Sequence, residues 1–244
     1  MPYEERKYRK QFSAQGLVGF EVVEKETDLF IFADKDLTQE AKKSIFKYRK
    51  ILEDYLLKDN NFEKSFTPLK VPLFAPQIIK EMAHAAKLAN VGPMAAVAGA
   101  VAEFAGRDLL KHSKEIIVEN GGDIFLKIDK PRKIGIFAGN SPLSNKLAIE
   151  IKPEDTPCGV CTSSGTVGHS FSFGKADAAT IIAKSASLAD AAATAVCNLV
   201  KTPDDIQKAV DAGKKIKGVL GILIIIEKKM GSWGKIHFVQ KSSA

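Results

Sequence analysis

The sequence of 244 residues contains only three cysteines and a single tryptophan. So few cysteines, in an odd number, do not make a disulfide framework, and a chain of this length can bury a core without one. The longest apolar run, residues 219–226, is far shorter than the roughly 20 residues that a membrane-spanning helix requires. The composition therefore excludes a small disulfide-stapled protein, and no membrane-spanning segment is predicted.

Acidic residues are outnumbered, and the formal net charge is +7. The basic residues lie in both the N-terminal and the C-terminal third and do not interleave with aromatic residues, so no nucleic-acid partner is expected. A mild positive field favours small phosphorylated ligands. The first residues are charged and lack the apolar segment of a secretory signal, so a cytoplasmic protein with reduced cysteines is expected.

The order of the predicted elements favours a layered α+β protein. The predicted strands are 17–23, 29–33, 116–118, 124–128, 133–137, 146–151, 179–183, 219–227 and 235–239, and the predicted helices are 39–57, 76–88, 93–110, 188–200 and one that begins near Pro203. Loops are expected at 24–28, 157–174 and 230–234. Because strands and helices alternate irregularly, with hairpins at both ends, we expect a mixed or antiparallel sheet with packed helices in a single domain, 1–244, and no doubly wound sheet.

Two further segments carry candidate binding groups. Asn120-Gly121-Gly122-Asp123 predicts a tight hairpin turn, because Asn-Gly tolerates positive φ. The stretch 156–170 is rich in Gly, Ser and Thr, and such a loop offers N–H groups and hydroxyls that can hold phosphate oxygens. Its candidate phosphate-binding residues are Ser163, Ser164, Gly165 and Thr166. His169, at the end of the stretch, is a candidate general base, and the alternative is a flexible surface loop without function.

Cys158 and Cys161 form a Cys-x-x-Cys pair within this stretch, which is the spacing of zinc ribbons and of thiol redox sites. A structural zinc needs two more ligands, and the spacing of Cys197 and the histidines predicts no such arrangement. The pair motivates a second hypothesis, in which Cys158 or Cys161 is catalytic in sulfur metabolism, as in sulfur transfer or in homocysteine or cysteine assimilation.

Asp190 has two interpretations. The run Ser187-Leu188-Ala189-Asp190 is similar to a capping box, which assigns Asp190 to the start of its own helix. Asp190 and Thr194 are also four residues apart and share one helix face, where a carboxylate and a hydroxyl together can ligate a hard cation such as Mg²⁺. Spacing alone leaves both open.

Taken together, these segments resemble the ApbE family of flavin transferases. Ser163-Ser164-Gly165, then His169, then Ala189-Asp190-Ala191-Ala192-Ala193-Thr194-Ala195 follow one another much as in that family. Asn120-Gly121-Gly122-Asp123-Ile124 resembles the family's Gly-Gly-Asp/Asn-Ile segment. The similarity runs from about residue 92 to residue 200, and the whole chain looks like an uncharacterised, ApbE-like branch.

The resemblance implies an ApbE-like fold that binds FAD or FMN with Mg²⁺ and transfers FMN through a phosphoester to a threonine of an acceptor protein. It implies that Asp190 and Thr194 are magnesium ligands, that His169 is the histidine of the catalytic loop, and that the Gly121-Gly122 turn with Asp123 lies near the flavin nucleotide.

One motif departs from the family pattern. Where the transferases have Asp-Pro-x-Thr-Gly after the histidine, this chain has Ser170-Phe171-Ser172-Phe173-Gly174. A non-catalytic binding subunit on the same scaffold therefore stays open beside the transferase, and the sequence also leaves homo-oligomerisation open.

Overall fold

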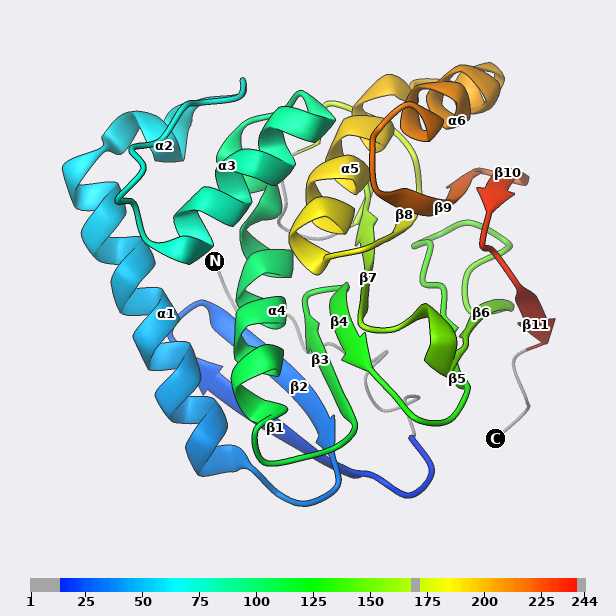
Figure 1. Ribbon diagram of the computed structural model, residues 1–244. Helices are drawn as coiled ribbons and strands as arrows, with labels where there is room; N and C mark the ends of the chain where they lie inside the picture. The colour runs from blue at the N-terminus through cyan, green and yellow to red at the C-terminus, as the bar shows by residue number, and fades with distance from the viewer. Residues whose placement is uncertain (1–13, 168–171, 241–244) are drawn as a thin grey trace.

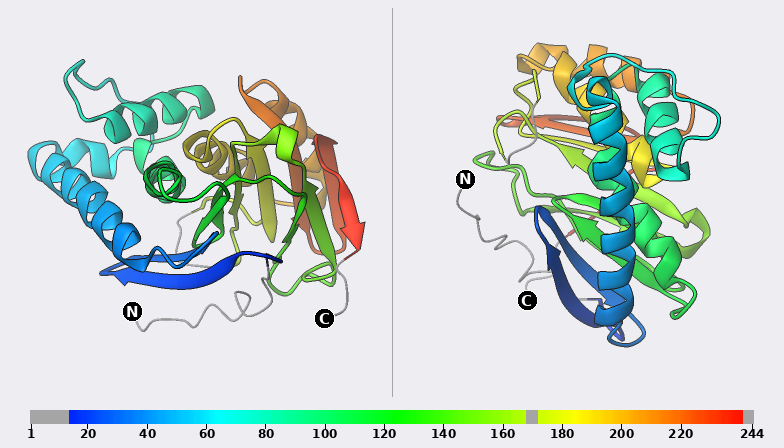
Figure 2. Two further views of the ribbon diagram at one scale, coloured as in Figure 1. Left: turned by 60° about the horizontal axis from the view of Figure 1, so that its bottom comes forward. Right: turned by 90° about the vertical axis from the view of Figure 1, so that its left-hand side faces the viewer.

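The computed structural model describes residues 14–167 and 172–240, in three layers (Figure 1, Figure 2). Helices form one layer, an eight-stranded sheet forms the middle layer, and a three-stranded sheet covers part of its other face. All strand pairs in the described part are antiparallel, so the predicted α+β class is confirmed in its antiparallel form.

The large sheet has the spatial order β1 (Val18–Glu24), β2 (Thr27–Ala33), β3 (Ile116–Asn120), β4 (Asp123–Lys127), β7 (Cys158–Ser163), β8 (Ala178–Ala183), β9 (Val219–Ile226) and β10 (Lys229–Gly234). The small sheet has the order β11 (Phe238–Gln240), β6 (Leu147–Ile151) and β5 (Arg132–Gly135). The helices are α1 (Thr38–Lys58), α2 (Asn60–Lys64), α3 (Gln77–Ala89), α4 (Val97–Leu109), α5 (Ala186–Leu199) and α6 (Ile206–Lys214). Single 3₁₀ turns lie at Pro93–Ala96, Pro153–Asp155 and Pro203–Asp205.

The two faces of the large sheet bury separate cores, because successive side chains of a strand point to opposite faces. On the helix side, Val118, Phe125 and Cys161 pack beneath α4 and α5. On the other side, Ile124 and Leu126 pack with residues of the small sheet. The chain leaves the large sheet after β4, forms β5 and β6, and returns as β7 next to β4.

The start of α5 lies unusually close to both of its neighbours. A Cβ atom added to Gly159 of β7 would lie 2.3 Å from the Cα of Ala186, and one added to Gly99 of α4 would lie 2.2 Å from the carbonyl oxygen of Ala186. The alanine- and glycine-rich composition of these elements therefore serves close packing, which brings α4 and α5 against each other over the centre of the sheet (Figure 1).

The predicted loop 157–174 is wrong in its first half, because Cys158–Ser163 forms the buried strand β7. Its Gly, Ser and Thr residues have the composition of a loop, but pairing with β4 and β8 and burial under α5 determine the conformation. The loop proper begins after Ser163.

The two hairpins differ from prediction in the position of their turns. The first turn contains only Lys25 and Glu26, because Thr27 already pairs with Glu24. The second turn lies at Glu227 and Lys228, where Glu227 has φ 54°, so the predicted loop 230–234 is the edge strand β10. The segment predicted as its partner, 235–239, overlaps β11, which joins the small sheet.

Within residues 14–167 and 172–240, no single helix has both the length and the apolar character to cross a membrane. One bent pair, Gln77–Ala89 with Pro93–Leu109, reaches that length and composition only when both halves are counted together.

Candidate functional site

The candidate site is centred on the turn between β3 and β4. Gly121 and Gly122 have φ values of 67° and 103°, which confirms the predicted tight turn with positive φ at both central positions. The carboxylate of Glu119 accepts a hydrogen bond from the N–H of Gly122 at 2.7 Å. The side-chain amide of Asn120 donates to the carbonyl oxygen of Ala98 at 3.0 Å, which fixes the turn beside the start of α4.

Asp190 approaches the same place from α5. Its Oδ2 accepts a hydrogen bond from the N–H of Gly99 at 2.9 Å, so the carboxylate points toward the first turn of α4. Thr194 lies one turn further along α5 and is partly accessible.

The predicted capping role of Asp190 is wrong. The N-cap of α5 is Ser185, whose hydroxyl accepts from the N–H of Leu188 at 3.2 Å, so the observed cap lies two residues before the predicted cap Ser187. Asp190 therefore lies beyond the capping positions, and its contact is with another helix.

Asp123 brings a second carboxylate to Asp190. It begins β4 opposite Cys161 of β7. Burial raises the pKa of Asp123 well above its ordinary value, and the negative charges of Asp190 and Glu119 raise it further. Burial also raises the pKa of Asp190 to about 7, although hydrogen bonds from the N–H groups of Gly99 and Ala98 oppose this effect.

Both neighbouring carboxylates resist ionisation, and a bound divalent cation would relieve the repulsion between their negative charges. In the described part of the chain, no cluster of three or more His, Cys, Asp or Glu side chains is arranged to hold a metal ion. The carboxylates of Asp123 and Asp190 nevertheless fit Mg²⁺, since this ion is commonly bound by one or two carboxylates, with water and ligand phosphates completing its shell. The hydroxyl of Thr194 is a further oxygen on the same helix face.

The predicted phosphate-binding groups of the loop are engaged with one another. The Ser164 hydroxyl accepts from the N–H groups of Thr166 at 3.1 Å and Val167 at 3.0 Å. The Thr166 hydroxyl donates to Asp177 at 3.0 Å. A Cβ atom on Gly165 would lie 2.1 Å from the carbonyl oxygen of Gly174, so the backbone at Gly165 packs directly against the backbone at Gly174.

The remaining predicted residues of this stretch fall in different places. Ser163 is buried at the end of β7 and hydrogen-bonds the thiol of Cys197 on α5. His169 lies outside the described residues, which resume at Ser172, and the Ser172 hydroxyl contacts Asn198 of α5 at 3.1 Å. Asn198 is eight residues beyond Asp190, or about 12 Å along the helix. One face of α5 therefore connects the carboxylates with the loop.

The two cysteines of the Cys-x-x-Cys pair are separated by the sheet. Residues three apart in a strand point to opposite faces, so Cys158 is buried toward the small sheet and Cys161 is buried beneath the helices. This geometry offers neither a disulfide nor a shared metal. Burial raises the pKa of Cys158 to about 12 and the pKa of Cys161 well above its ordinary range, so both are held as thiols.

We expect all three cysteines to resist alkylation in the native protein. The thiolate is the nucleophile, and each thiol is buried with a raised pKa. Mass spectrometry after iodoacetamide treatment, with a urea-unfolded sample as control, measures this. Rapid native labelling of Cys158 or Cys161 would restore the thiol-based hypothesis.

Two residues of the site could not be found from sequence reasoning. Gly99 supplies the N–H group for Asp190 and also the space for α5. Glu103, 2% exposed, accepts hydrogen bonds from the N–H groups of Ala186 at 2.9 Å and Ser187 at 3.2 Å, so the start of α5 is capped by a carboxylate of α4. Gly99 and Glu103 each contact residues of α5 that lie more than 80 positions away in the chain, so no local sequence pattern predicts these contacts.

Comparisons with known proteins agree with this architecture. A family model described as AbpE bacteria matches residues 9–233. The UPF0280 protein MJ1526 of Methanocaldococcus jannaschii is 45% identical over 227 residues, covering 91% of this chain and 92% of that protein. A UPF0280 protein of Methanospirillum hungatei is 44% identical over 214 residues, covering 87% and 86%.

Solved structures share the fold at much lower identity. The flavin transferase ApbE from Vibrio cholerae superposes with a TM-score of 0.59 and 13% identity, over 90% of this chain and 97% of that chain. The ApbE protein from Thermotoga maritima gives a TM-score of 0.55 and 16% identity, over 88% and 96%. The predicted ApbE-like fold is thereby confirmed.

Proposed function

We propose the function on one premise: this chain belongs to the family described as AbpE bacteria, with the UPF0280 proteins as its relatives. On that premise, the protein binds a flavin nucleotide, FAD or FMN, together with Mg²⁺, and transfers FMN from FAD to a hydroxyl of an acceptor protein. The observation that carries the proposal is the pair of carboxylates, Asp123 and Asp190: Asp123 directly follows the Gly121-Gly122 turn, and the charge of Asp190 raises the pKa of Asp123.

Each part of the site has a chemical role in this proposal. Asp190 and Asp123, with the Thr194 hydroxyl, would hold the cation, which when bound supplies stabilisation of negative charge on the diphosphate. The Gly121-Gly122 turn carries no side chains, so a nucleotide can approach its backbone closely.

In the transfer, the acceptor oxygen bonds to the FMN phosphorus while the bond to the AMP phosphate breaks, and AMP leaves. The hydroxyl proton passes to a base, for which His169 is the sequence candidate.

A titration of the full chain with FAD, with and without Mg²⁺, tests the proposal. Flavin fluorescence reports binding, and chromatography of the mixture with a threonine-containing acceptor peptide reports AMP. Magnesium-dependent binding with AMP release supports a transferase. Binding without AMP reduces the proposal to a flavin-binding subunit, and no binding in either condition overturns it.

The affinity for Mg²⁺ should rise as the pH rises through about 7. The cation competes with the proton for Asp190, whose pKa burial raises to about 7, so affinity should gain roughly tenfold per pH unit below that value for one released proton. Calorimetric titrations at about pH 6 and about pH 8 measure this. Equal affinities at both values would contradict the assignment of Asp190 as a ligand.

The stability of the metal-free protein should change in the opposite direction. The folded pKa of Asp190 lies above its ordinary value of about 4, so its contribution to stability is fully present below that value. The contribution is lost as the pH rises through about 7, and added Mg²⁺ should restore stability there.

A further inference from the structure

The connection between α2 and α3 carries an apolar turn, residues 72–75, which projects from the helical layer (Figure 2). The N–H of Ala75 donates to the carbonyl oxygen of Pro72 at 3.0 Å, so Leu73 and Phe74 occupy the two central positions of a β-turn. Their side chains are 94% and 91% exposed, the highest values for large apolar residues in the described part of the chain. Small polar residues, glycine and proline are the usual occupants of these positions, so the turn itself does not require Leu or Phe.

The backbone of the apolar turn is fixed from both sides. Ala75 is 5% exposed and belongs to the core on the helix side of the large sheet. Pro72 and Pro76 restrict φ at the two ends of the turn. Nζ of Lys80 donates to the carbonyl oxygen of Leu73 at 3.5 Å. Two adjacent large apolar side chains that are presented in this way mark a contact surface.

The charges within this segment are positive. Between Glu63 and Glu81 the sequence contains three lysines, Lys64, Lys70 and Lys80, and no acidic residue. The whole chain also has a net charge of +7. A partner that covers the apolar turn is therefore expected to carry negative charge.

The size of the apolar turn distinguishes a protein partner from a bilayer. An aromatic side chain buries roughly 150–250 Å², so Leu73 and Phe74 together supply at most about half of the roughly 800 Å² per partner that a stable protein interface requires. A bilayer surface, by contrast, accepts apolar side chains one by one. Binding to it grows with the apolar area that is buried and with the attraction between lysines and anionic lipids.

We propose that the apolar turn docks the protein on the surface of a bilayer that contains anionic lipids. Leu73 and Phe74 enter the boundary between headgroups and acyl chains, and Lys70 and Lys80 contact the headgroups. α3 is 13 residues long, about 20 Å, and separates the apolar turn from the 3₁₀ turn that leads into α4. The candidate flavin site therefore lies at the other end of α3, and the proposal does not depend on the proposed function.

Vesicle flotation of the full chain, without flavin or Mg²⁺, tests the proposal. One set of vesicles contains phosphatidylcholine alone, and the other contains equal parts of phosphatidylcholine and phosphatidylglycerol. We expect at least about tenfold tighter binding to the mixed vesicles, and loss of this difference in about 1 M salt. Absence of binding to the mixed vesicles, or equal binding to both kinds, overturns the proposal.

The double variant Leu73→Ser with Phe74→Ser removes the apolar anchor and leaves the core intact, so it should stay folded and bind mixed vesicles at least about tenfold more weakly. Val23→Ser is the matched control. Val23 is 49% exposed, and its neighbour Val22 packs in the helix-side core, so Val23 points to the other face of the sheet. Unchanged binding by the double variant contradicts the proposal, and so does an equal loss in Val23→Ser.

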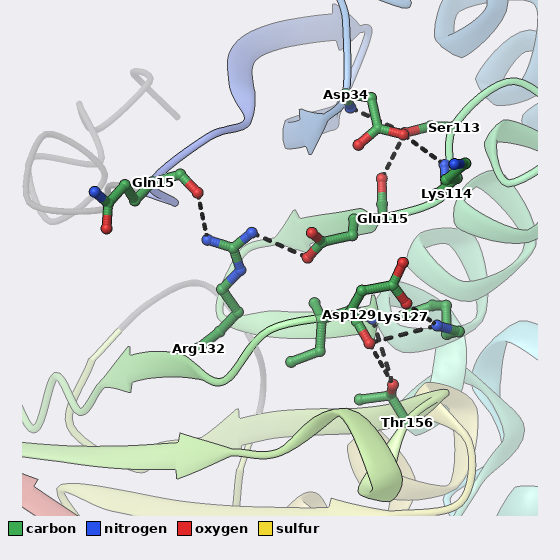
Figure 3. A network of polar contacts seen from close by, with 10 residues as sticks. Gln15, Asp34, Ser113, Lys114, Glu115, Lys127, Asp129, Arg132 and Thr156 are labelled. Atoms are coloured by element: carbon green, nitrogen blue, oxygen red, sulfur yellow. Dashed lines mark hydrogen bonds and ion pairs between the residues drawn. The ribbon is translucent and has the colours of Figure 1, made fainter.

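Lys70→Gln tests the electrostatic part and should weaken binding to mixed vesicles about fivefold. Lys127→Gln is its control, because Lys127 lies on β4 and pairs with Asp129 at 2.7 Å, within the polar network shown in Figure 3. An equal loss in both lysine variants would assign the binding to net charge and overturn the docking element.

Phe74→Trp reports insertion directly. Its emission should shift to shorter wavelengths when mixed vesicles are added, whereas the emission of the native protein, from Trp233 of β10, should not. Bound vesicles without this shift overturn the proposal. Sedimentation of the native protein tests the competing occupant. A dimer that the Leu73→Ser/Phe74→Ser variant dissociates would make the apolar turn a contact between two copies of this chain, and also overturns the proposal.

Discussion

Asp190→Asn is expected to lower the affinity for Mg²⁺ by more than about 100-fold, since loss of a group that only supports a metal ligand already costs 10–100-fold. The asparagine oxygen can still accept the hydrogen bond from the N–H of Gly99, so α4 and α5 keep their contact. The substitution also removes a charge that burial disfavours. The metal-free variant should therefore be at least as stable as the wild type at about pH 8.

Calorimetry with Mg²⁺ and thermal unfolding with and without the cation measure the two effects. Asp204→Asn is the matched control, because the Asp204 side chain is 91% exposed and its ion pair with Lys229 is on the surface. Unchanged Mg²⁺ affinity in a folded Asp190→Asn variant would place the metal elsewhere. A loss of affinity in Asp204→Asn of the same size would mean that general surface charge, and not the carboxylate pair, attracts the ion.

Glu103→Ala should lower the free energy of unfolding by about 3 kcal/mol or more, because it leaves two buried N–H groups at the start of α5 without their acceptor. The carboxylate also pairs with Arg107. Urea denaturation followed by circular dichroism measures the change.

Arg107→Ala separates the ion pair from the cap. The Arg107 side chain is 59% exposed, so its removal should cost no more than about 1 kcal/mol. Glu103→Gln keeps one acceptor oxygen and should fall between the two alanine variants. If Glu103→Ala is as mild as Arg107→Ala, the capping of α5 by α4 contributes little to stability.

Sequence patterns predicted the elements whose periodicity is set locally. The apolar stripe of α1, with Ile45, Tyr48 and Leu52 buried, follows from spacing alone. The Gly121-Gly122 turn follows from the freedom of glycine at positive φ. Both features depend only on residues that are near one another in the chain, so they can be predicted from a single sequence.

The parts that failed depend on contacts between distant segments. The stretch that becomes β7 has the composition of a loop, and only its position between β4 and β8 makes it a strand. This one difference also changes the meaning of Cys158 and Cys161, since the same spacing that brings two thiols together in a loop separates them in a strand. Likewise, the contact of Asp190 with Gly99 spans 91 positions, so no local pattern predicts it.

Gly99 and Gly159 show what kind of constraint holds the carboxylates in place. Neither has positive φ, so neither is required by backbone conformation; both leave room for Ala186. The distance between α5 and its neighbours is thus determined by the absence of two methyl groups. An added methyl group at either position would displace Asp190 from the β3–β4 turn. A selection for activity should therefore detect Gly99→Ala or Gly159→Ala earlier than a selection for solubility does.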